Sequence, residues 1–319
     1  MSRGAHALLA GLVDYAGLFP PAALDLGPAA QNYGRYRTGP DAWMLGRFIV
    51  PASRLADLDA HVGALGEGAP LSVLGLPHDG DWLEAAVETL HQARAFEDRH
   101  DGTVVCDRFE IKLPAALAAD ADRLADVLND LDARYRDRGD AGPRAALEVP
   151  FRTDPETVGP AAQAVADANG RADRPAFALK LRCGGVTADL VPSVEAVATA
   201  ITEVRQAGAP FKATAGLHHP LPNADEAVGA RMLGFLGVFG GAALARLHGL
   251  GADDLAEILD DADASHWSLD DDGLAWTSLR ISPAELAGAR DQLALSFGSC
   301  SFDEPRDDLR QLSWLPARG

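Results

Sequence analysis

The sequence predicts an α/β fold, a (β/α)8 barrel of the TIM type with a C-terminal β-hairpin and capping segment. Short apolar runs bounded by turn residues alternate with amphipathic stretches, which is typical of repeated βα units around a parallel sheet. Eight such runs fit the 319 residues, and no G-x-G-x-x-G or P-loop motif indicates a doubly wound nucleotide-binding sheet. We therefore expect a single barrel domain over residues 1–319, with 264–319 as hairpin and cap.

The expected strands are short and rich in aliphatic residues. They are residues 12–15, 45–50, 71–76, 108–113, 145–149, 176–182, 210–214 and 274–281. Between them, apolar residues recur at three- and four-residue spacing, which predicts amphipathic helices. These helices are residues 54–65, 82–99, 116–136, 155–169 and 191–206. The two kinds of element alternate along the chain, as a barrel requires.

Local signals fix several boundaries. Residues 153–156 and 282–285 each place a capping side chain before a Pro and a Glu, which predicts helix starts. Residues 266–276 contain an Asp-Gly turn between two Trp-bearing arms, which predicts a β-hairpin. The Gly- and Ala-rich residues 232–247 predict a tightly packed helix that serves a dimer contact or packs internally. Residues 296–305 predict a small-residue loop that caps a site or closes the fold.

Charge and cysteine content limit the partners. The formal net charge of −19 disfavours nucleic acid and anionic membrane surfaces, because both bind basic patches. The N-terminus has no signal-peptide pattern, and apolar stretches are interrupted well before the ~18 residues of a membrane span. Three cysteines without metal-ligand spacing argue against a disulfide framework or a structural zinc. We expect a cytoplasmic protein, with a preference for Asp and Arg that resembles a salt-adapted proteome.

Lysine is rare in this chain. Of the 28 basic residues, 25 are Arg and three are Lys. Arg cannot lose its proton near neutral pH, so a retained Lys indicates a need for a compact amine that can. Each lysine lies in an apolar, strand-like run: Lys112 in 108–113, Lys180 in 177–182 and Lys212 in 210–214. We expect all three to be buried functional groups at the ends of neighbouring strands; a buried ion pair or a snorkelling side chain is the alternative.

Polar residues in the expected fourth to seventh strands share one parity. They are Glu110, Lys112, Glu148, Lys180, Arg182, Lys212 and Thr214. Apolar residues take the other parity: Phe109, Ile111, Leu113, Leu147, Val149, Leu179, Leu181 and Phe211. Side chains alternate between the interior and the helix layer of a barrel, so we expect the polar set to meet in one cavity. Crowded cations would lower one another's pKa and give a neutral, nucleophilic lysine, unless the set is only a structural plug of ion pairs.

Two of these strands resemble a known family. Residues 211–216, Phe-Lys-Ala-Thr-Ala-Gly, resemble the Lys-Thr-Ser-Thr-Gly strand end of deoxyribose-phosphate aldolases. Residues 180–186, Lys-Leu-Arg-Cys-Gly-Gly-Val, are similar to their Lys-x-x-Gly-Gly-Ile strand with one extra residue, and the two motifs stand in reverse order here. The resemblance implies a class I aldolase-like lyase in which Lys212 forms the Schiff base, Lys180 lowers its pKa, and Glu148 or Glu110 shuttles protons. If the roles follow chain order, Lys180 is the nucleophile and Lys212 the modulator.

Residues flanking the strand ends complete the expected site. The expected substrate-binding set is Asp14, Tyr15, Arg47, Arg182, Gly184, Gly185, Thr214, His218, His219 and Ser299. Arg182 and the free amides at Gly184 and Gly185 suit a phosphate or carboxylate, so we expect a small anionic or carbonyl substrate and no cofactor. Plain turns and caps are the alternatives for Asp14 and the Gly pair. Cys183 and Cys300 are expected to be small packing residues.

Two other functions compete with the lyase. The first is a metal-dependent barrel hydrolase or isomerase that uses His218, His219 and Glu148, although nearby lysines would repel a cation and no H-E-x-x-H motif occurs. The second is a non-catalytic barrel protein that binds anions and whose lysines have ordinary pKa values. Metal analysis and turnover assays would separate the three.

Overall fold

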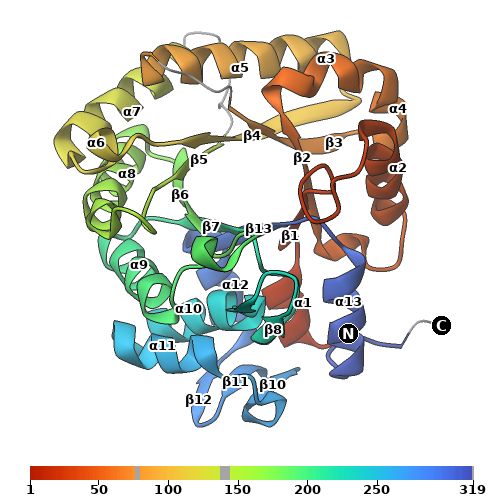
Figure 1. Ribbon diagram of the computed structural model, residues 1–319, viewed down its shortest axis with the longest axis vertical. Helices are drawn as coiled ribbons and strands as arrows, with labels where there is room; N and C mark the ends of the chain where they lie inside the picture. Colours follow the sequence, from red (N-terminus) through yellow and green to blue (C-terminus); the bar gives the residue numbers. More distant parts are fainter. Residues whose placement is uncertain (76–79, 137–143, 318–319) are drawn as a thin grey trace.

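The computed structural model describes residues 1–75, 80–136 and 144–317. Within these residues eight parallel strands close into a barrel in the order β1-β13-β7-β6-β5-β4-β3-β2, and helices surround it (Figure 1). The predicted fold class is confirmed. The barrel strands are β1 (Val13–Tyr15), β2 (Leu45–Pro51), β3 (Ala69–Leu74), β4 (Val104–Lys112), β5 (Arg144–Glu148), β6 (Phe177–Arg182), β7 (Phe211–Thr214) and β13 (Ala294–Ser299). Leu76, at the end of the third expected strand, lies outside the described residues.

The helices form a ring outside the strands (Figure 1). They are α1 (Arg3–Leu9), α2 (Leu26–Arg37), α3 (Leu55–Leu58), α4 (Val62–Leu65), α5 (Trp82–Arg99), α6 (Ala115–Ala118), α7 (Ala121–Arg136), α8 (Val158–Ala172), α9 (Val194–Ala207), α10 (Ala242–His248), α11 (Ala252–Asp260), α12 (Pro283–Gln292) and α13 (Asp303–Gln311). Short helical turns join them: η1 (Ala42–Met44), η2 (Ala52–Arg54), η3 (Asp59–His61), η4 (Pro155–Thr157), η5 (Ala188–Leu190) and η7 (Ala264–His266). The helix expected over 82–99 is confirmed as α5, whereas 54–65 and 116–136 are each divided.

The position predicted for the eighth barrel strand was wrong. Residues 274–281 bend at Thr277, whose φ is +49°, and form two strands of an antiparallel sheet outside the barrel. That sheet contains β10 (Trp267–Asp270), β11 (Gly273–Trp276) and β12 (Leu279–Ile281), and its first two strands confirm the predicted hairpin. The barrel is closed by β13, which lies within the segment expected to be a cap. Its inward positions are Ser296 and Gly298, which leaves Leu295 and Phe297 as its large apolar residues.

Local expectations elsewhere are mostly confirmed. Ser282 forms a capping box with Glu285 at the start of α12. Residues 232–247 contain a π-helical segment, η6 (Leu236–Gly241), followed by α10, and all of η6 is buried. Between β7 and η6 the chain forms a small antiparallel ribbon of β8 (Asn223–Asp225) and β9 (Ala230–Met232) that the sequence did not predict.

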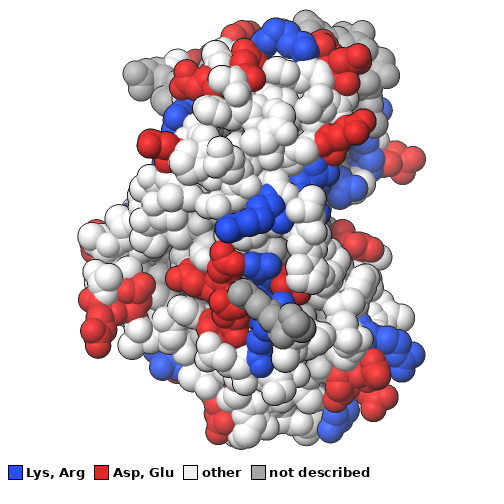
Figure 2. Space-filling view, turned by 90° about the vertical axis from the view of Figure 1, so that its right-hand side faces the viewer, with Lys and Arg blue, Asp and Glu red and all other residues white. Residues whose placement is uncertain are grey.

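The surface carries both signs of charge. On the face shown in Figure 2, basic side chains lie singly or in small groups among acidic ones. None of the described helices combines the length and the apolar character that a membrane span needs.

Candidate functional site

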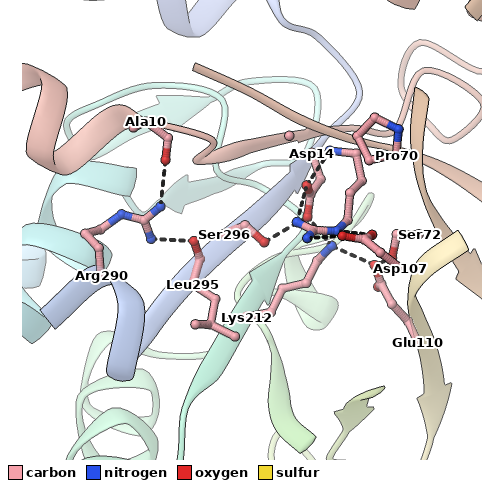
Figure 3. Close-up of polar contacts among 12 residues, drawn as sticks. Ala10, Asp14, Pro70, Ser72, Asp107, Glu110, Lys212, Arg290, Leu295 and Ser296 are labelled. Atoms are coloured by element: carbon pink, nitrogen blue, oxygen red, sulfur yellow. Dashed lines mark hydrogen bonds and ion pairs between the residues drawn. The ribbon is translucent and has the colours of Figure 1, made fainter. Parts of the chain in front are cut away.

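Five charged side chains form an alternating chain inside the barrel. Lys212 Nζ lies 2.5 Å from Asp14 Oδ2 and 2.6 Å from Glu110 Oε1. Lys180 Nζ lies 2.9 Å from Glu110 Oε2 and 2.8 Å from Glu148 Oε2. Figure 3 shows Lys212 reaching between Asp14 and Glu110, which project from opposite sides. Glu110 therefore joins the two lysines into one network, which we call the lysine network.

Strand register explains how these side chains meet. Glu148 on β5 is the register partner of Lys180 on β6, and Lys180 is that of Lys212 on β7. Their apolar neighbours of opposite parity, including Leu179 and Phe211, are buried in the hydrophobic core. The predicted separation of a polar inner face from an apolar outer face is confirmed in these strands. The alternation of side chains along a strand thus places the network inside the barrel.

The carboxylates accept further hydrogen bonds. Asp14 accepts one from Ser296 Oγ at 2.8 Å and one from the Arg47 backbone N–H at 2.7 Å. Glu110 accepts one from Ser72 Oγ at 2.6 Å. These bonds hold each carboxylate in one orientation, which is necessary because unpaired buried charges cost several kcal/mol. Neither serine was predicted as part of the site. Inward parity on the expected third strand could have identified Ser72, whereas no strand was expected at Ser296.

The pairing sets the charge state of the network. Burial alone would raise the pKa of Glu110, but Lys180 and Lys212 outweigh burial and hold it well below its ordinary value. Burial likewise opposes ionisation of Asp14 and Glu148, yet Lys212 and Lys180 respectively keep their pKa values low. Burial would lower the pKa of Lys180, and Glu110 and Glu148 raise it instead. For Lys180, the prediction that crowded cations lower lysine pKa values is therefore wrong, because carboxylates lie between the cations.

Exposure increases along the network from Lys212 to Glu148. The Lys212 and Asp14 side chains are 0% exposed and Glu110 is 1% exposed. Lys180 and Glu148 are 8% and 12% exposed. Lys180 and Glu148 are thus the members that a small molecule can reach first. Both lie near the C-terminal ends of their strands, where TIM-barrel active sites are found.

The predicted burial of Lys112 was wrong. Its side chain was expected to be buried, but the residue is exposed at the last position of β4. It stays close enough to Glu148 that its charge, like that of the half-buried Arg182, helps to lower the Glu148 pKa. Lys112 and Arg182 therefore supply positive charge at the rim of the network.

Two residues that were predicted to bind substrate, Tyr15 and Arg47, make structural contacts instead. Tyr15 points outward and its ring packs against Tyr33, Tyr36 and Phe48. Arg47 makes a bidentate ion pair with Asp107, with both contacts at 2.6 Å.

The residues predicted to bind substrate at the strand ends also make local structural contacts. Ser299 accepts a hydrogen bond from the Ser301 backbone within its own turn. A Cβ on Gly184 would lie 2.9 Å from Gly216 Cα, and one on Gly185 would lie 2.2 Å from Leu190 Cβ, so both glycines serve close packing. Thr214 is half-buried beside Gly298, and its Oγ1 would lie 3.3 Å from a Cβ built there.

The two adjacent histidines contact α13 instead of the lysine network. His218 Nδ1 lies 2.9 Å from Glu304 Oε2, and His219 Nδ1 lies 2.5 Å from Asp308 Oδ2. Across the described residues, no group of three or more His, Cys, Asp or Glu side chains could hold a metal ion. The metal-dependent alternative needs His218, His219 and Glu148 as ligands. The two histidines pair with α13 and Glu148 pairs with Lys180, so these three side chains do not form one ligand set.

Comparisons with known proteins do not assign the chain. No protein-family model matches it, and no curated protein matches its sequence.

Proposed function

We propose that this protein is a class I aldolase-like lyase that activates a small carbonyl substrate by forming a Schiff base with Lys180. The observation that carries the proposal is the position of Lys180, whose amine lies 2.8 Å from the Glu148 carboxylate and whose side chain is 8% exposed, against 0% for Lys212. A nucleophilic amine needs access to the carbonyl carbon and a base within hydrogen-bond reach. Exposure favours Lys180 over the fully buried Lys212, the second of the two role assignments that the sequence allowed.

Glu148 fits the proton-transfer role. Lys180 is protonated in the resting network, so its amine must pass a proton to Glu148 as the carbonyl approaches. The neutral amine then adds to the carbonyl carbon, and a proton moves from its nitrogen to the carbonyl oxygen to give a hydroxyl group. Glu148 returns the proton to the resulting hydroxyl group, which leaves as water and gives the iminium ion. The iminium accepts the electron pair released when the adjacent carbon–carbon bond breaks, which is the step that defines a lyase of this class.

Lys212, Asp14 and Glu110 are positioning residues in this mechanism. Lys212 keeps Glu110 ionised, and Glu110 holds the Lys180 amine by its second carboxylate oxygen at 2.9 Å. A fixed amine can be held close to its near-attack position, which lowers the entropic part of the barrier. At the rim, the charges of Lys112 and Arg182 suit a substrate that carries a carboxylate or phosphate.

One observation favours a second candidate. Because Glu110 and Glu148 raise the pKa of Lys180, its ammonium ion could stabilise an enolate without forming a covalent bond. Such an enzyme would exchange the proton next to the carbonyl with solvent, as an isomerase does. The non-catalytic anion-binding alternative predicts neither a covalent adduct nor exchange.

Borohydride trapping tests the proposal. The protein is incubated with a panel of short aldehydes and 2-keto acids, reduced with borohydride, digested and mapped by mass spectrometry. We expect a reduced adduct at Lys180 that is abolished in Lys180→Met and retained in Lys112→Arg, which keeps the rim charge. Adducts confined to Lys112, or none with any carbonyl, would contradict it. Solvent deuterium exchange without an adduct would support the enolate mechanism, and carboxylate binding with neither would support the binding protein.

A further inference from the structure

We propose that Cys300 is a second reactive group of this protein, a nucleophilic thiol paired with His218 and Glu304 that hydrogen peroxide oxidises. The lysine network does not contain these residues, and the proposed lyase activity does not require them. Sequence analysis expected Cys300 to be a small packing residue, because no base could be placed beside it.

The three side chains meet through the closure of the barrel. Cys300 directly follows β13, His218 follows β7, and Glu304 lies in the first turn of α13. Since β7 and β13 are neighbouring strands, Cys300 Sγ lies 3.9 Å from His218 Nε2 and 4.0 Å from Nδ1. Glu304 Oε2 lies 2.9 Å from the same Nδ1. A thiol, an imidazole and an orienting carboxylate in this sequence are the components of an activated cysteine.

Electrostatics favours a charged imidazole in this cluster. Burial alone would lower the pKa of His218, but its hydrogen bonds to Cys300 and Glu304 raise it to about 10. A histidinium beside a thiol stabilises the thiolate, which is the nucleophilic form. Other titratable groups facing the cluster are His219, whose charge acts on Glu304, and Tyr15 at the end of β1, which interacts with Cys300. None of these places a carboxylate against the sulfur in the contacts described.

Cys106 provides an internal comparison. The two cysteines are equally shielded, with 7% exposure for Cys106 and 8% for Cys300. Burial, Glu97 and Asp107 raise the pKa of Cys106 to about 12, so it stays a thiol at neutral pH. Burial raises the pKa of Cys183, which is 1% exposed, to about 12 as well. Because access is matched between Cys106 and Cys300, neighbouring charge decides which of them reacts.

The oxidation step is balanced with peroxide as the oxidant. The Cys300 sulfur attacks one oxygen of hydrogen peroxide, the O–O bond breaks, and its electron pair leaves with hydroxide. Hydroxide takes the proton of the His218 imidazolium and becomes water. The sulfur becomes a sulfenic acid, which is the first and reversible stage of cysteine oxidation.

Alkylation of the full-length protein tests the thiol. Limiting iodoacetamide is added at pH 7 and the three cysteines are quantified by mass spectrometry over time. We expect Cys300 to react at least about tenfold faster than Cys106 and Cys183. His218→Gln should slow Cys300 alkylation about tenfold. The matched control is His219→Gln. This variant removes the neighbouring histidine, which pairs with Asp308 instead of Cys300, and should change the rate much less than His218→Gln does.

A second measurement uses peroxide itself. Treatment with hydrogen peroxide in the presence of dimedone, which traps sulfenic acids, should label Cys300 and spare Cys106. Equal labelling of the two cysteines, or a Cys300 rate that His218→Gln leaves unchanged, would overturn the proposal. If His218→Gln does not fold, Glu304→Gln replaces a half-exposed partner and should slow alkylation in the same direction; an unchanged rate there would also overturn it.

Discussion

Lys212 is the most deeply buried charge of the lysine network. Its side chain has no exposed surface, and its ammonium ion lies between two carboxylates that are also buried. Removing it would leave Asp14 and Glu110 facing each other, with the charges of Lys180, Arg47 and Arg108 as partial compensation. The network therefore requires Lys212 for stability, whatever its part in chemistry.

We predict that Lys212→Met lowers the free energy of unfolding by about 3–5 kcal/mol, the usual cost of removing one partner from a buried ion pair. Urea denaturation followed by circular dichroism measures the change. Lys112→Met is the matched control, because Lys112 is exposed and its replacement should change stability by less than about 0.5 kcal/mol. Equal denaturation midpoints for the two variants would show that the buried pairs contribute little.

From the sequence it was possible to predict which side chains face the barrel interior, but not how deeply each of them is buried. Lysine rarity and strand parity identified Lys180, Lys212, Glu110 and Glu148, which the structure brings together. Parity says which way a side chain points, whereas its height along the barrel depends on how the strands are staggered. Lys112 shares the parity of Glu110 and yet is exposed at the strand end.

At the scale of elements, the ends of β6 and β7 are held together by glycine. A Cβ on Gly184 would lie 2.8 Å from Met232 Cε and 2.9 Å from Gly216 Cα. A methionine methyl group can move aside, but a backbone atom cannot move without shifting its strand. The close approach therefore fixes the two strands that carry Lys180 and Lys212.

We predict that Gly184→Ala destabilises the protein by about 1–3 kcal/mol, the range expected for overpacking. Gly288→Ala is the control, because Gly288 lies within α12 and a Cβ there would meet nothing within 4 Å. Alanine is the better helix former, so that variant should be more stable by about 0.5–1 kcal/mol. Thermal denaturation of both variants measures the difference, and a Gly184→Ala protein as stable as wild type would show that the strand ends adjust freely.

The misassigned eighth strand has the same physical origin as the missed thiol site. β13 carries Ser296 and Gly298 on its inner face, because the interior beside it is filled by Asp14 and Lys212 rather than by its own side chains. With small residues facing inward, the apolar signature of this strand is limited to Leu295 and Phe297. The contact between Cys300 and His218 follows from which strand closes the barrel, and so it could not be predicted once that strand was misplaced.

At the scale of the whole molecule, two electrostatic effects oppose each other. The chain has 47 acidic and 28 basic residues, so its net charge of −19 at pH 7 disfavours the folded state by self-repulsion. A lower pH adds protons to the chain and reduces that repulsion. The buried carboxylates act in the other direction, because their charged forms are stabilised by lysine only when the barrel is folded.

We predict that stability passes through a maximum between about pH 4.5 and 7. The pKa of Glu110 is lowered on folding from its ordinary value of 4.5, so the unfolded chain binds its proton first as the pH falls. The stability that this carboxylate contributes is therefore complete above 4.5 and is lost as the pH falls toward the folded-state value. Asp14 and Glu148 change in the same direction. Urea denaturation at a series of pH values measures the curve.

Salt and one substitution separate the two effects. About 0.5 M KCl should raise stability at pH 7, where repulsion between exposed charges is screened, and should change the acid branch much less because buried pairs are screened weakly. In Glu110→Gln the stability deficit relative to wild type should be greatest near pH 7 and should shrink below 4.5, since the wild-type carboxylate is then losing its advantage. A deficit that stays constant with pH would mean that Glu110 contributes through packing and hydrogen bonding alone, and not through its charge.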